Sequence, residues 1–306
     1  MHEGSKKAII AAFLANLGIA IAKFIGFLIT RSAGLLAESA HSLADTGNQG
    51  LLLFGSKRAL RKADRQHPFG YGPERYFWSF VVALVLFSMG GLFAIYEGIS
   101  KLAHPHGIDS AIVAYIILGL SIVLEGYSLR TAVHEAAPLK GAGQSWWSFI
   151  KEAKSPELPV VLLEDAGALI GLVFALLGLS LAEITGNARF DAVGSIAIGV
   201  LLVAIAIVLA VEMKGLLIGE SAADDVQQAI EAAIATSPNV VGLIHIRSMH
   251  LGPEELLVVA KIDYNHDLTV SELAQAVDTT EVAIRAAAPL SMTIYIEPDI
   301  RRQLPS

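Results

Sequence analysis

The sequence contains no cysteine, and this absence removes two kinds of chemistry. Disulfide bonds and thiolate metal sites are excluded, so any bound metal must be held by His, Asp, Glu or main-chain oxygens. Charge is also scarce, because only 17% of the 306 residues are charged whereas 54% are hydrophobic. Together with a mean hydropathy of +0.58, this composition indicates a membrane protein with several spans. The net charge of −7 gives no support to nucleic-acid binding.

A cleavable targeting segment is not expected either. The polar start, residues 1–7, leads into an apolar segment that is too long for the core of a signal peptide and has no convincing cleavage site. We therefore expect the first helix to insert and stay. The lack of a targeting segment favours a bacterial inner membrane.

Six stretches have the roughly 20 mostly apolar residues that a spanning helix needs. They are residues 8–30, 33–54, 76–99, 111–132, 158–181 and 192–213. The second is the least hydrophobic because it contains a polar cluster, as expected for a helix that carries a site inside a bundle.

Lysine and arginine are concentrated in two of the connecting segments, between the second and third stretches and between the fourth and fifth. Positive residues favour the cytoplasmic side, so these segments and both chain termini are expected in the cytoplasm. The second segment, residues 138–156, also contains Trp146 and Trp147. It is either an amphipathic segment at the membrane surface or a simple linker helix.

After Lys214 the composition becomes that of a soluble domain. The pattern predicts helices at 222–236 and 271–287 and strands at 241–249, 256–264 and 292–296. The order αββαβ indicates a small α+β domain of the ferredoxin-like type, with helices on a sheet. We therefore expect a transmembrane domain at 1–216 and a cytoplasmic domain at 217–306, whose small size favours dimerisation.

The polar cluster of the second stretch contains His41 and Asp45. Because they are four residues apart, they share one face of a helix. A neutral imidazole beside a carboxylate suits a divalent metal of the zinc type. The alternative is that both are polar groups that bond to a neighbouring helix.

Two adjacent carboxylates, Glu164 and Asp165, lie deep in the fifth stretch. They point about 100° apart on a helix, so both need not face one site. Buried neighbouring anions repel each other, and a cation or protons must neutralise them. Since His41 and Asp45 reach a similar depth, three or four ligands from the two helices can meet near the middle of the membrane.

Three further side chains are weaker candidates. Glu125 in the fourth stretch lies near the depth of Asp165 and is a candidate proton relay, although it can equally pair with Arg130 or Lys23. Asp64 and His67 form an oxygen and nitrogen pair beside turn residues, which indicates either a loop metal site or an ordinary loop.

Taken together, these features resemble the cation diffusion facilitator family of divalent-metal transporters, over nearly the whole chain. The helix-two motif of that family, HxxxD, matches His41 and Asp45. The loop motif DxxHPFGHxxxE matches Asp64, His67, Pro68, Phe69, Gly70 and, in spacing, Glu74 or a near neighbour, and Asp191 with Gly194 and Ser195 at the start of the sixth helix is also similar.

The chain departs from the family pattern in helix five, where HxxxD is usual. Val161 stands where the histidine is expected, and Glu164 is an additional carboxylate. This arrangement is similar to the subgroup related to the mitochondrial-type zinc transporters. The resemblance implies a transport site of His41, Asp45, Glu164 and Asp165, a set hard enough that manganese, iron or cobalt compete with zinc as the substrate.

A second departure concerns the accessory metal sites. Tyr71 replaces the second histidine of the loop motif, which leaves Asp64 and His67. In the soluble domain, Ala260, Ser271 and Tyr295 fall where family ligands often lie, and His245, His250, His266 and Glu297 do not match the binuclear site. We therefore expect a metal-poor or metal-free soluble domain that serves dimerisation.

The sequence thus predicts a homodimeric membrane antiporter, not an enzyme and without a prosthetic group, that exports Zn²⁺ in exchange for protons by alternating access. One alternative is a membrane metal sensor that binds metal without moving it. A channel would give flux without proton coupling. A membrane-embedded metallohydrolase would need an open metal position and a general base, and the sequence has no HExxH motif.

Overall fold

A computed structural model describes residues 3–105, 107, 110–141 and 143–301, with side chains from residue 16 onward. The outermost residues of both predicted domains, 1–2 and 302–306, and residue 142 of the predicted amphipathic segment lie outside these ranges. The chain divides into two compact units, one formed by Met1–Lys57 with Tyr76–Lys214 and the other by Arg58–Arg75 with Gly215–Ser306. The two units are described separately.

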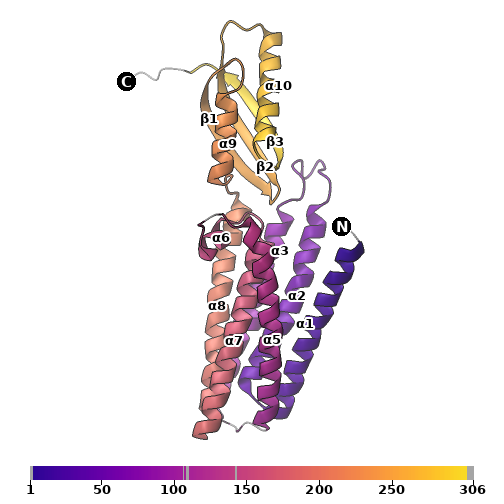
Figure 1. The fold of residues 1–306 in the computed structure, drawn as a ribbon, viewed down its shortest axis with the longest axis vertical. Helices are drawn as coiled ribbons and strands as arrows, with labels where there is room; N and C mark the ends of the chain where they lie inside the picture. The colour runs from indigo at the N-terminus through magenta and orange to yellow at the C-terminus, as the bar shows by residue number, and fades with distance from the viewer. Residues whose placement is uncertain (1–2, 106, 108–109, 142, 302–306) are drawn as a thin grey trace, which may run out of the picture. The chain divides into compact units, whose positions relative to one another are not determined.

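The first unit is a bundle of long helices (Figure 1). They are α1 (Glu3–Thr30), α2 (Ala33–Ala59), α3 (Glu74–Val85) continued by the π-helix η1 (Leu86–Leu92) and α4 (Phe93–Ala103), α5 (Ala111–Ala136) continued by the 3-10 turn η2 (Ala137–Leu139), the short α6 (Trp146–Glu152), α7 (Glu157–Thr185) and α8 (Arg189–Ile218). Each of the six predicted apolar stretches lies within one of these helical segments.

Four of the segments are long and apolar enough to cross a membrane. They are Glu74–Ala103, Ala111–Leu139, Glu157–Thr185 and Arg189–Ile218. The polar cluster of α2 lowers its hydropathy, and the part of α1 with described side chains, Asn16–Thr30, is apolar but short. The chain is therefore a helical membrane protein, and the count of six spans stays a prediction.

Helices α7 and α8 cross at two glycines. A Cβ atom on Gly194 would lie 3.3 Å from Gly178 Cα and 3.0 Å from the Phe174 carbonyl oxygen. Small residues allow the backbones of membrane helices to approach closely. Leu172 and Leu179 of α7 pack in the same fully buried core, which extends across the bundle.

The start of α8 is tied to the turn between α1 and α2 by a buried network. Asp191 accepts hydrogen bonds from Ser32 Oγ and the Ala33 backbone N–H, both at 2.6 Å, and from Lys101 Nζ at 2.8 Å. Lys101 also donates to the Arg31 carbonyl oxygen at 2.7 Å. Asp191 therefore caps the otherwise unpaired N-terminal amide of α2 from another helix.

The short helix α6 lies within the predicted amphipathic segment. The Ser145 side chain caps its start by accepting from the Ser148 N–H. Phe149 is buried with residues of α5 and α7, whereas Trp146 and Trp147 are exposed. The segment is thus a helix docked on the bundle through one apolar face.

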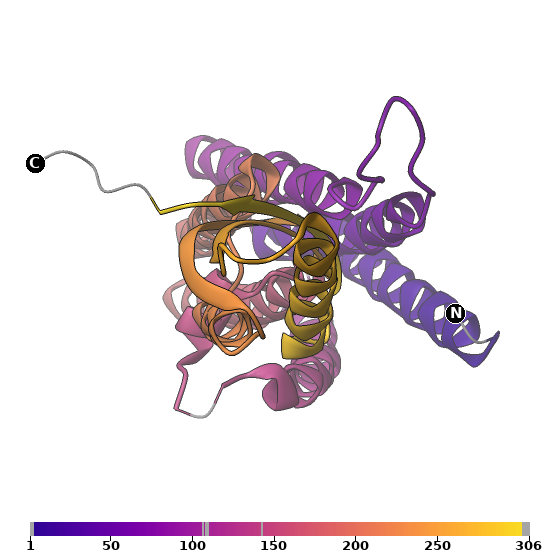
Figure 2. The ribbon, with the colours of Figure 1, turned by 90° about the horizontal axis from the view of Figure 1, so that it is seen from above.

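The second unit contains a sheet with two helices on one face (Figures 1 and 2). Its elements are α9 (Asp224–Ala235), β1 (Val240–Gly252), β2 (Glu255–Tyr264), α10 (Val270–Ala287) and β3 (Ser291–Asp299), in the predicted order αββαβ. The strand order is β1-β2-β3, with β1 and β2 antiparallel and β2 and β3 parallel. Alternate residues of β2, Val258 and Ile262 among them, are fully buried against Ile230 of α9 and Ile284 of α10.

The opposite face of this sheet carries an exposed, partly apolar surface. Val259 of β2 is 41% exposed and Tyr295, its partner in β3, is 55% exposed. Lys261 lies beside them and pairs with Glu297 at 3.1 Å and Asp299 at 3.0 Å. The helices do not cover this face.

The loop between α2 and α3 belongs to the second unit. A Cβ atom on Gly72 would collide with the Leu251 carbonyl oxygen, and Arg75 Nη1 lies 3.5 Å from Glu254 Oε1. The predicted boundary at residue 216 assigns this loop to the transmembrane domain, and that division stays a prediction.

Candidate metal site in the helix bundle

Helix α2 presents a polar stripe to the interior of the bundle. Glu38, Ser42, Asp45 and Gln49 follow one another at spacings of four, three and four residues, so they lie along one face of the helix. Four such positions inside a membrane helix are costly unless a partner satisfies them. The stripe therefore needs either neighbouring side chains or an ion.

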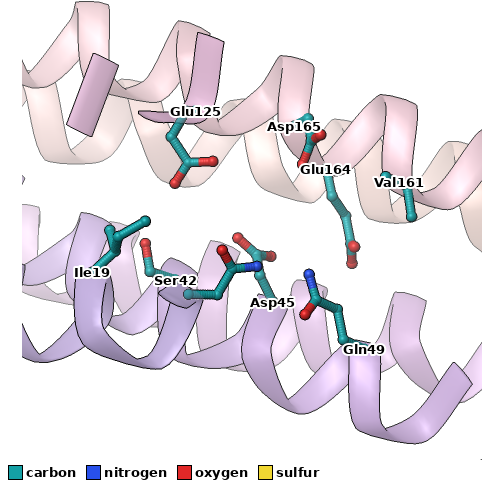
Figure 3. Close-up of a pocket in the computed structure, with 9 residues that line it drawn as sticks. Ile19, Ser42, Asp45, Gln49, Glu125, Val161, Glu164 and Asp165 are labelled. Carbon is teal, nitrogen blue, oxygen red and sulfur yellow. The ribbon is translucent and has the colours of Figure 1, made fainter. Parts of the chain in front are cut away.

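A small cavity of about 20 Å³ adjoins this stripe. Its lining residues are Asn16, Ile19, Ser42, Asp45, Gln49, Glu125, Val161, Glu164 and Asp165. Figure 3 shows Glu125, Glu164 and Asp165 on one side and Ser42, Asp45 and Gln49 on the other. A cavity of this size holds about one water-sized group. Four carboxylates from α2, α5 and α7 thus line a space of about the size of one water molecule.

Both adjacent carboxylates of α7 line this cavity, although they point in different directions from the helix. Glu164 Oε1 accepts a hydrogen bond from Asn48 Nδ2 at 2.6 Å, and Asp165 Oδ2 accepts one from Ser128 Oγ at 2.8 Å. Each is therefore oriented by a neighbouring helix, which is how supporting residues commonly fix metal ligands. Val161 lines the cavity too, so the departure from HxxxD falls at the cavity wall.

His41 lies beside the cavity rather than on its wall. The side chain is fully buried, and its Nε2 is 3.5 Å from Asp45 Oδ2. On the other side, a Cβ atom on Gly90 would lie 3.9 Å from His41 Nδ1. Gly90 belongs to the π-helix η1, and π-helical turns within α-helices are frequent at functional sites.

Several buried polar atoms in this region have no hydrogen-bond partner among the described residues. They are Glu38 Oε1, His41 Nδ1 and Nε2, Asp45 Oδ1 and Asn48 Oδ1. A buried polar atom without a partner costs about 1–3 kcal/mol, so such a group calls for an explanation. The carboxylate and amide oxygens accept hydrogen bonds, and in a neutral histidine one ring nitrogen accepts while the other donates. Histidine nitrogens and carboxylate oxygens are also metal ligands.

The four predicted ligands are thus close together without forming a finished coordination shell. Within the described part of the chain, no three His, Asp or Glu side chains are arranged to hold a metal ion. Asp45, Glu164 and Asp165 share the cavity, whereas His41 contacts only Asp45 among them. The assignment of these residues as a transport site therefore stays a prediction.

Glu125 lines the cavity and lies 3.5 Å from Lys23 Nζ. Of the two pairings open from the sequence, with Arg130 or with Lys23, the structure forms the second. Lys23 is fully buried and also donates to Glu38 Oε2 at 3.1 Å and to Ser42 Oγ at 2.8 Å. It therefore pairs within the bundle instead of extending to the membrane surface.

Sequence reasoning did not assign the amide and hydroxyl side chains of the cavity. Asn16, Ser42 and Gln49 line it, and Asn48 holds Glu164. The spacing of Ser42 and Gln49 relative to Asp45 was available as a signal. The position of Asn16 depends on how α1 packs, which no local pattern predicts.

The loop pair Asp64 and His67 forms a hydrogen-bonded turn. Asp64 Oδ1 accepts from the backbone N–H groups of Gln66 and His67, and Oδ2 accepts from the Tyr71 hydroxyl at 2.7 Å. The Tyr71 hydroxyl, followed by the backbone N–H of His67, lowers the pKa of Asp64 below its usual range. Three of the roughly four acceptor sites of this carboxylate are thus used by protein donors, and the imidazole Nδ1 of His67 lies 3.6 Å from Asp64 Oδ1.

The histidines of the soluble domain contact protein groups. His266 Nε2 lies 3.1 Å from Asp263 Oδ1, and His250 Nδ1 lies 3.2 Å from the Gly252 carbonyl oxygen. His245 Nε2 accepts from Arg247 Nε at 2.9 Å. These three side chains are in separate places on the strands and the following turn, and each has its own partner.

A bundle of apolar helices that encloses a carboxylate-lined cavity defines an integral membrane protein, and intramembrane carboxylates of this kind are typical of proteins that move ions. The family model for the cation efflux transmembrane domain matches residues 9–218. The chain belongs to this cation efflux family.

The chain is similar to several curated members of this family. It is 32% identical over 264 residues to the human mitochondrial proton-coupled zinc antiporter SLC30A9, covering 86% of this chain and 46% of the relative. It is 31% identical over 271 residues to metal tolerance protein C4 of Arabidopsis thaliana, covering 88% and 59%. The metal cation efflux system protein CzcD of Cupriavidus metallidurans is 27% identical over 295 residues, covering 93% and 87%.

The chain spans about half the length of the SLC30A9 relatives that it matches. The resemblance to the mitochondrial-type subgroup, read from the Glu164–Asp165 pair, is confirmed by these similarities. The family is one of cation efflux proteins, which is consistent with a transporter rather than with the metallohydrolase alternative.

Proposed function

We propose that the protein is a proton-coupled antiporter that exports a divalent transition metal, with Zn²⁺ as the favoured substrate. The observation that carries this proposal is the cavity in which Asp45, Glu164 and Asp165 meet from two helices. Its acidic lining suits a small divalent cation, and human SLC30A9 is named as a zinc antiporter. His41, Asp45, Glu164 and Asp165 would bind the metal.

Proton coupling follows from the energetics of the same carboxylates. An empty cavity with several ionised carboxylates is costly inside a membrane, so either a metal or protons must occupy it. Metal and proton compete for the same lone pairs, and each can therefore drive the release of the other. Glu125, at the edge of the cavity, is the candidate proton relay.

Alternating access would expose this cavity to the two sides of the membrane in turn. The π-helix η1 beside His41 supports such a movement, because its hydrogen-bond pattern interrupts the regular helix next to the proposed ligand. Measurements of metal flux in each direction across the membrane would test this step.

The flux experiment uses the full chain in proteoliposomes under an imposed pH gradient. We expect Zn²⁺ flux that depends on the gradient and is lost in Asp45→Ala and in Asp165→Ala. Glu135→Gln, which alters an exposed carboxylate of α5, is the matched control and should keep the wild-type rate. Flux that ignores the gradient would point to a channel, and metal binding without flux would point to a sensor.

A second substrate class is favoured by one feature of the cavity. Its polar lining groups are carboxylates, amides and one hydroxyl, and His41 is not among them. An oxygen-rich set is hard and suits Mn²⁺, Fe²⁺ or Co²⁺ better than a set with two histidines does. Competition of these ions against Zn²⁺ in the same flux assay distinguishes the two.

The remaining assignments concern the assembly and its setting. We propose a transmembrane domain at 1–216 and a ferredoxin-like dimerisation domain at 217–306, with the exposed sheet face around Val259 and Tyr295 as the dimer surface. Both termini would face the cytoplasm, by the distribution of Lys and Arg, and the membrane would be a bacterial inner membrane. Asp64 and His67 remain a possible loop metal site. Chemical crosslinking of the full chain in membranes, with Val259→Lys as the disrupting variant, tests the dimer.

A further inference from the structure

The cavity adjoins a buried cation that belongs to the protein itself. Lys23 of α1 is 0% exposed, and its ammonium lies 3.1 Å from Glu38 Oε2 and 3.5 Å from Glu125 Oε1. A buried lysine is costly unless carboxylates and further hydrogen bonds compensate it. Here one ammonium forms ion pairs with carboxylates from two different helices.

The two carboxylates differ in their access to the cavity. Glu38 lies against α7, since a Cβ atom on Gly171 would be 2.5 Å from Glu38 Oε1, and Glu38 does not line the cavity. Glu125 does line it, together with Asp45 and Asp165. Lys23 therefore pairs both with Glu38, which is buried away from the cavity, and with Glu125, which faces the proposed metal.

We propose that Lys23 is a specificity-determining residue, which holds Glu125 out of the coordination shell of the transported metal. This inference rests on the proposed function. With Glu125 paired to the ammonium, the cavity offers Asp45, Glu164 and Asp165, beside His41. This small number of ligands suits Zn²⁺, which prefers four-coordinate sites.

Loss of the ammonium would free Glu125 to become a further oxygen ligand. A larger set of hard oxygen donors suits Mn²⁺, which prefers carboxylate, carbonyl and water ligands. The charge on Lys23 would thus set which metal the cavity prefers, without touching the metal.

The alternative is a purely structural role, in which Lys23 only neutralises Glu38. The double variant Lys23→Met with Glu38→Gln separates the two roles, because it removes the ion pair without leaving either charge buried alone. If neutralisation is the only role, this variant keeps the wild-type metal preference. If Lys23 acts through Glu125, the preference shifts.

The test measures Zn²⁺ and Mn²⁺ uptake by the full chain in proteoliposomes, and competitive binding of the two ions to the purified chain. We expect the double variant to shift the ratio of Zn²⁺ to Mn²⁺ toward Mn²⁺ by about tenfold, the scale seen when groups that support a metal site are changed. Adding Glu125→Gln to the double variant should reverse the shift. Lys23→Arg, which keeps the cation, should retain the wild-type ratio.

Three results would overturn the inference: an unchanged ratio in the double variant, a shift that persists when Glu125→Gln is added, or a lost preference in Lys23→Arg. If the double variant does not fold, the single variant Glu125→Gln is the test. The inference requires that this variant keeps the wild-type ratio of Zn²⁺ to Mn²⁺. If Glu125 is a metal ligand in the wild type, the ratio should change. Failure of the proposed function is recognised separately. In that case wild type moves neither ion, and the binding ratios of the same variants still test Lys23; absence of binding of both ions would overturn both.

Discussion

The buried networks around Lys101 and Lys23 differ in how completely their polar atoms are paired. At the start of α8, both oxygens of Asp191 accept hydrogen bonds, and Lys101 has two acceptors. Around the cavity, Asp45 Oδ1 and Glu38 Oε1 have no partner among the described residues. Burial of charge is common to both regions, so burial alone does not mark an ion site.

The difference indicates what each network does. A network whose atoms are all satisfied holds helices together and has no capacity left for a ligand. A region that keeps unpaired acceptors at a cost calls for a further partner, such as a bound ion or water. The predictions below test this distinction, from the largest expected effect to the smallest.

Lys101→Met should destabilise the bundle strongly. It leaves Asp191 buried without its cation, and breaking a buried pair by removing one partner typically costs about 3–5 kcal/mol. Thermal unfolding of the purified chain measures the loss. Flux per folded molecule should be retained, and a specific loss of flux with unchanged stability would mean that this network is part of the transport site.

Asp45→Asn should have the opposite profile. The unpaired Oδ1 gains nothing from its charge in the empty protein, so stability should change little, whereas Zn²⁺ flux should fall at least about hundredfold if a direct ligand is lost. Both quantities are measured on the same preparation. Normal flux in this variant would remove Asp45 from the proposed ligands.

Val161→His should change metal preference more than rate. The side chain lines the cavity, and an added imidazole restores the nitrogen donor that zinc favours over harder metals. We expect the Zn²⁺ to Mn²⁺ flux ratio to rise by about tenfold. An unchanged ratio would show that this position of α7 does not set selectivity.

Tyr71→Phe should have the smallest effect, because the carboxylate that loses its hydrogen bond, Asp64, is exposed. Removing the hydroxyl should raise the pKa of Asp64 toward its usual range, while the backbone donors His67 and Gln66 keep part of the depression. A lowered carboxyl pKa stabilises the loop above the unfolded pKa, and this stabilisation is lost as pH falls through the folded pKa. Carboxyl NMR titration measures the change, and an unaltered Asp64 pKa would contradict the role given to Tyr71.

Much of the architecture could be predicted because it depends on local pattern. The apolar stretches and the αββαβ order follow from hydropathy and from the period of the apolar residues. Strand β1 is longer than the predicted 241–249 and spans Val240–Gly252, because its pairing with β2 extends beyond the apolar run. The pairing of Lys101 with Asp191 could not be predicted, since the two residues lie 90 positions apart and meet only when α4 and α8 pack.

The candidate site was predictable in part for the same reason. The spacing of His41 and Asp45 on α2 and the adjacent carboxylates of α7 are visible in the sequence. The rotation of each helix about its axis determines which of these side chains face the cavity. It brings both Glu164 and Asp165 to the cavity and turns His41 toward η1, and it depends on packing between helices rather than on residue type.

The measurement that tests the central claim most directly is anomalous scattering at the zinc absorption edge from crystals of the full chain grown with Zn²⁺. The account predicts a peak in the bundle cavity, at the roughly 2.0–2.2 Å from carboxylate oxygens of Asp45 and Asp165 that zinc ligands require. Peaks found only at the Asp64–His67 loop or beside Asp191, with an unoccupied cavity, would contradict it.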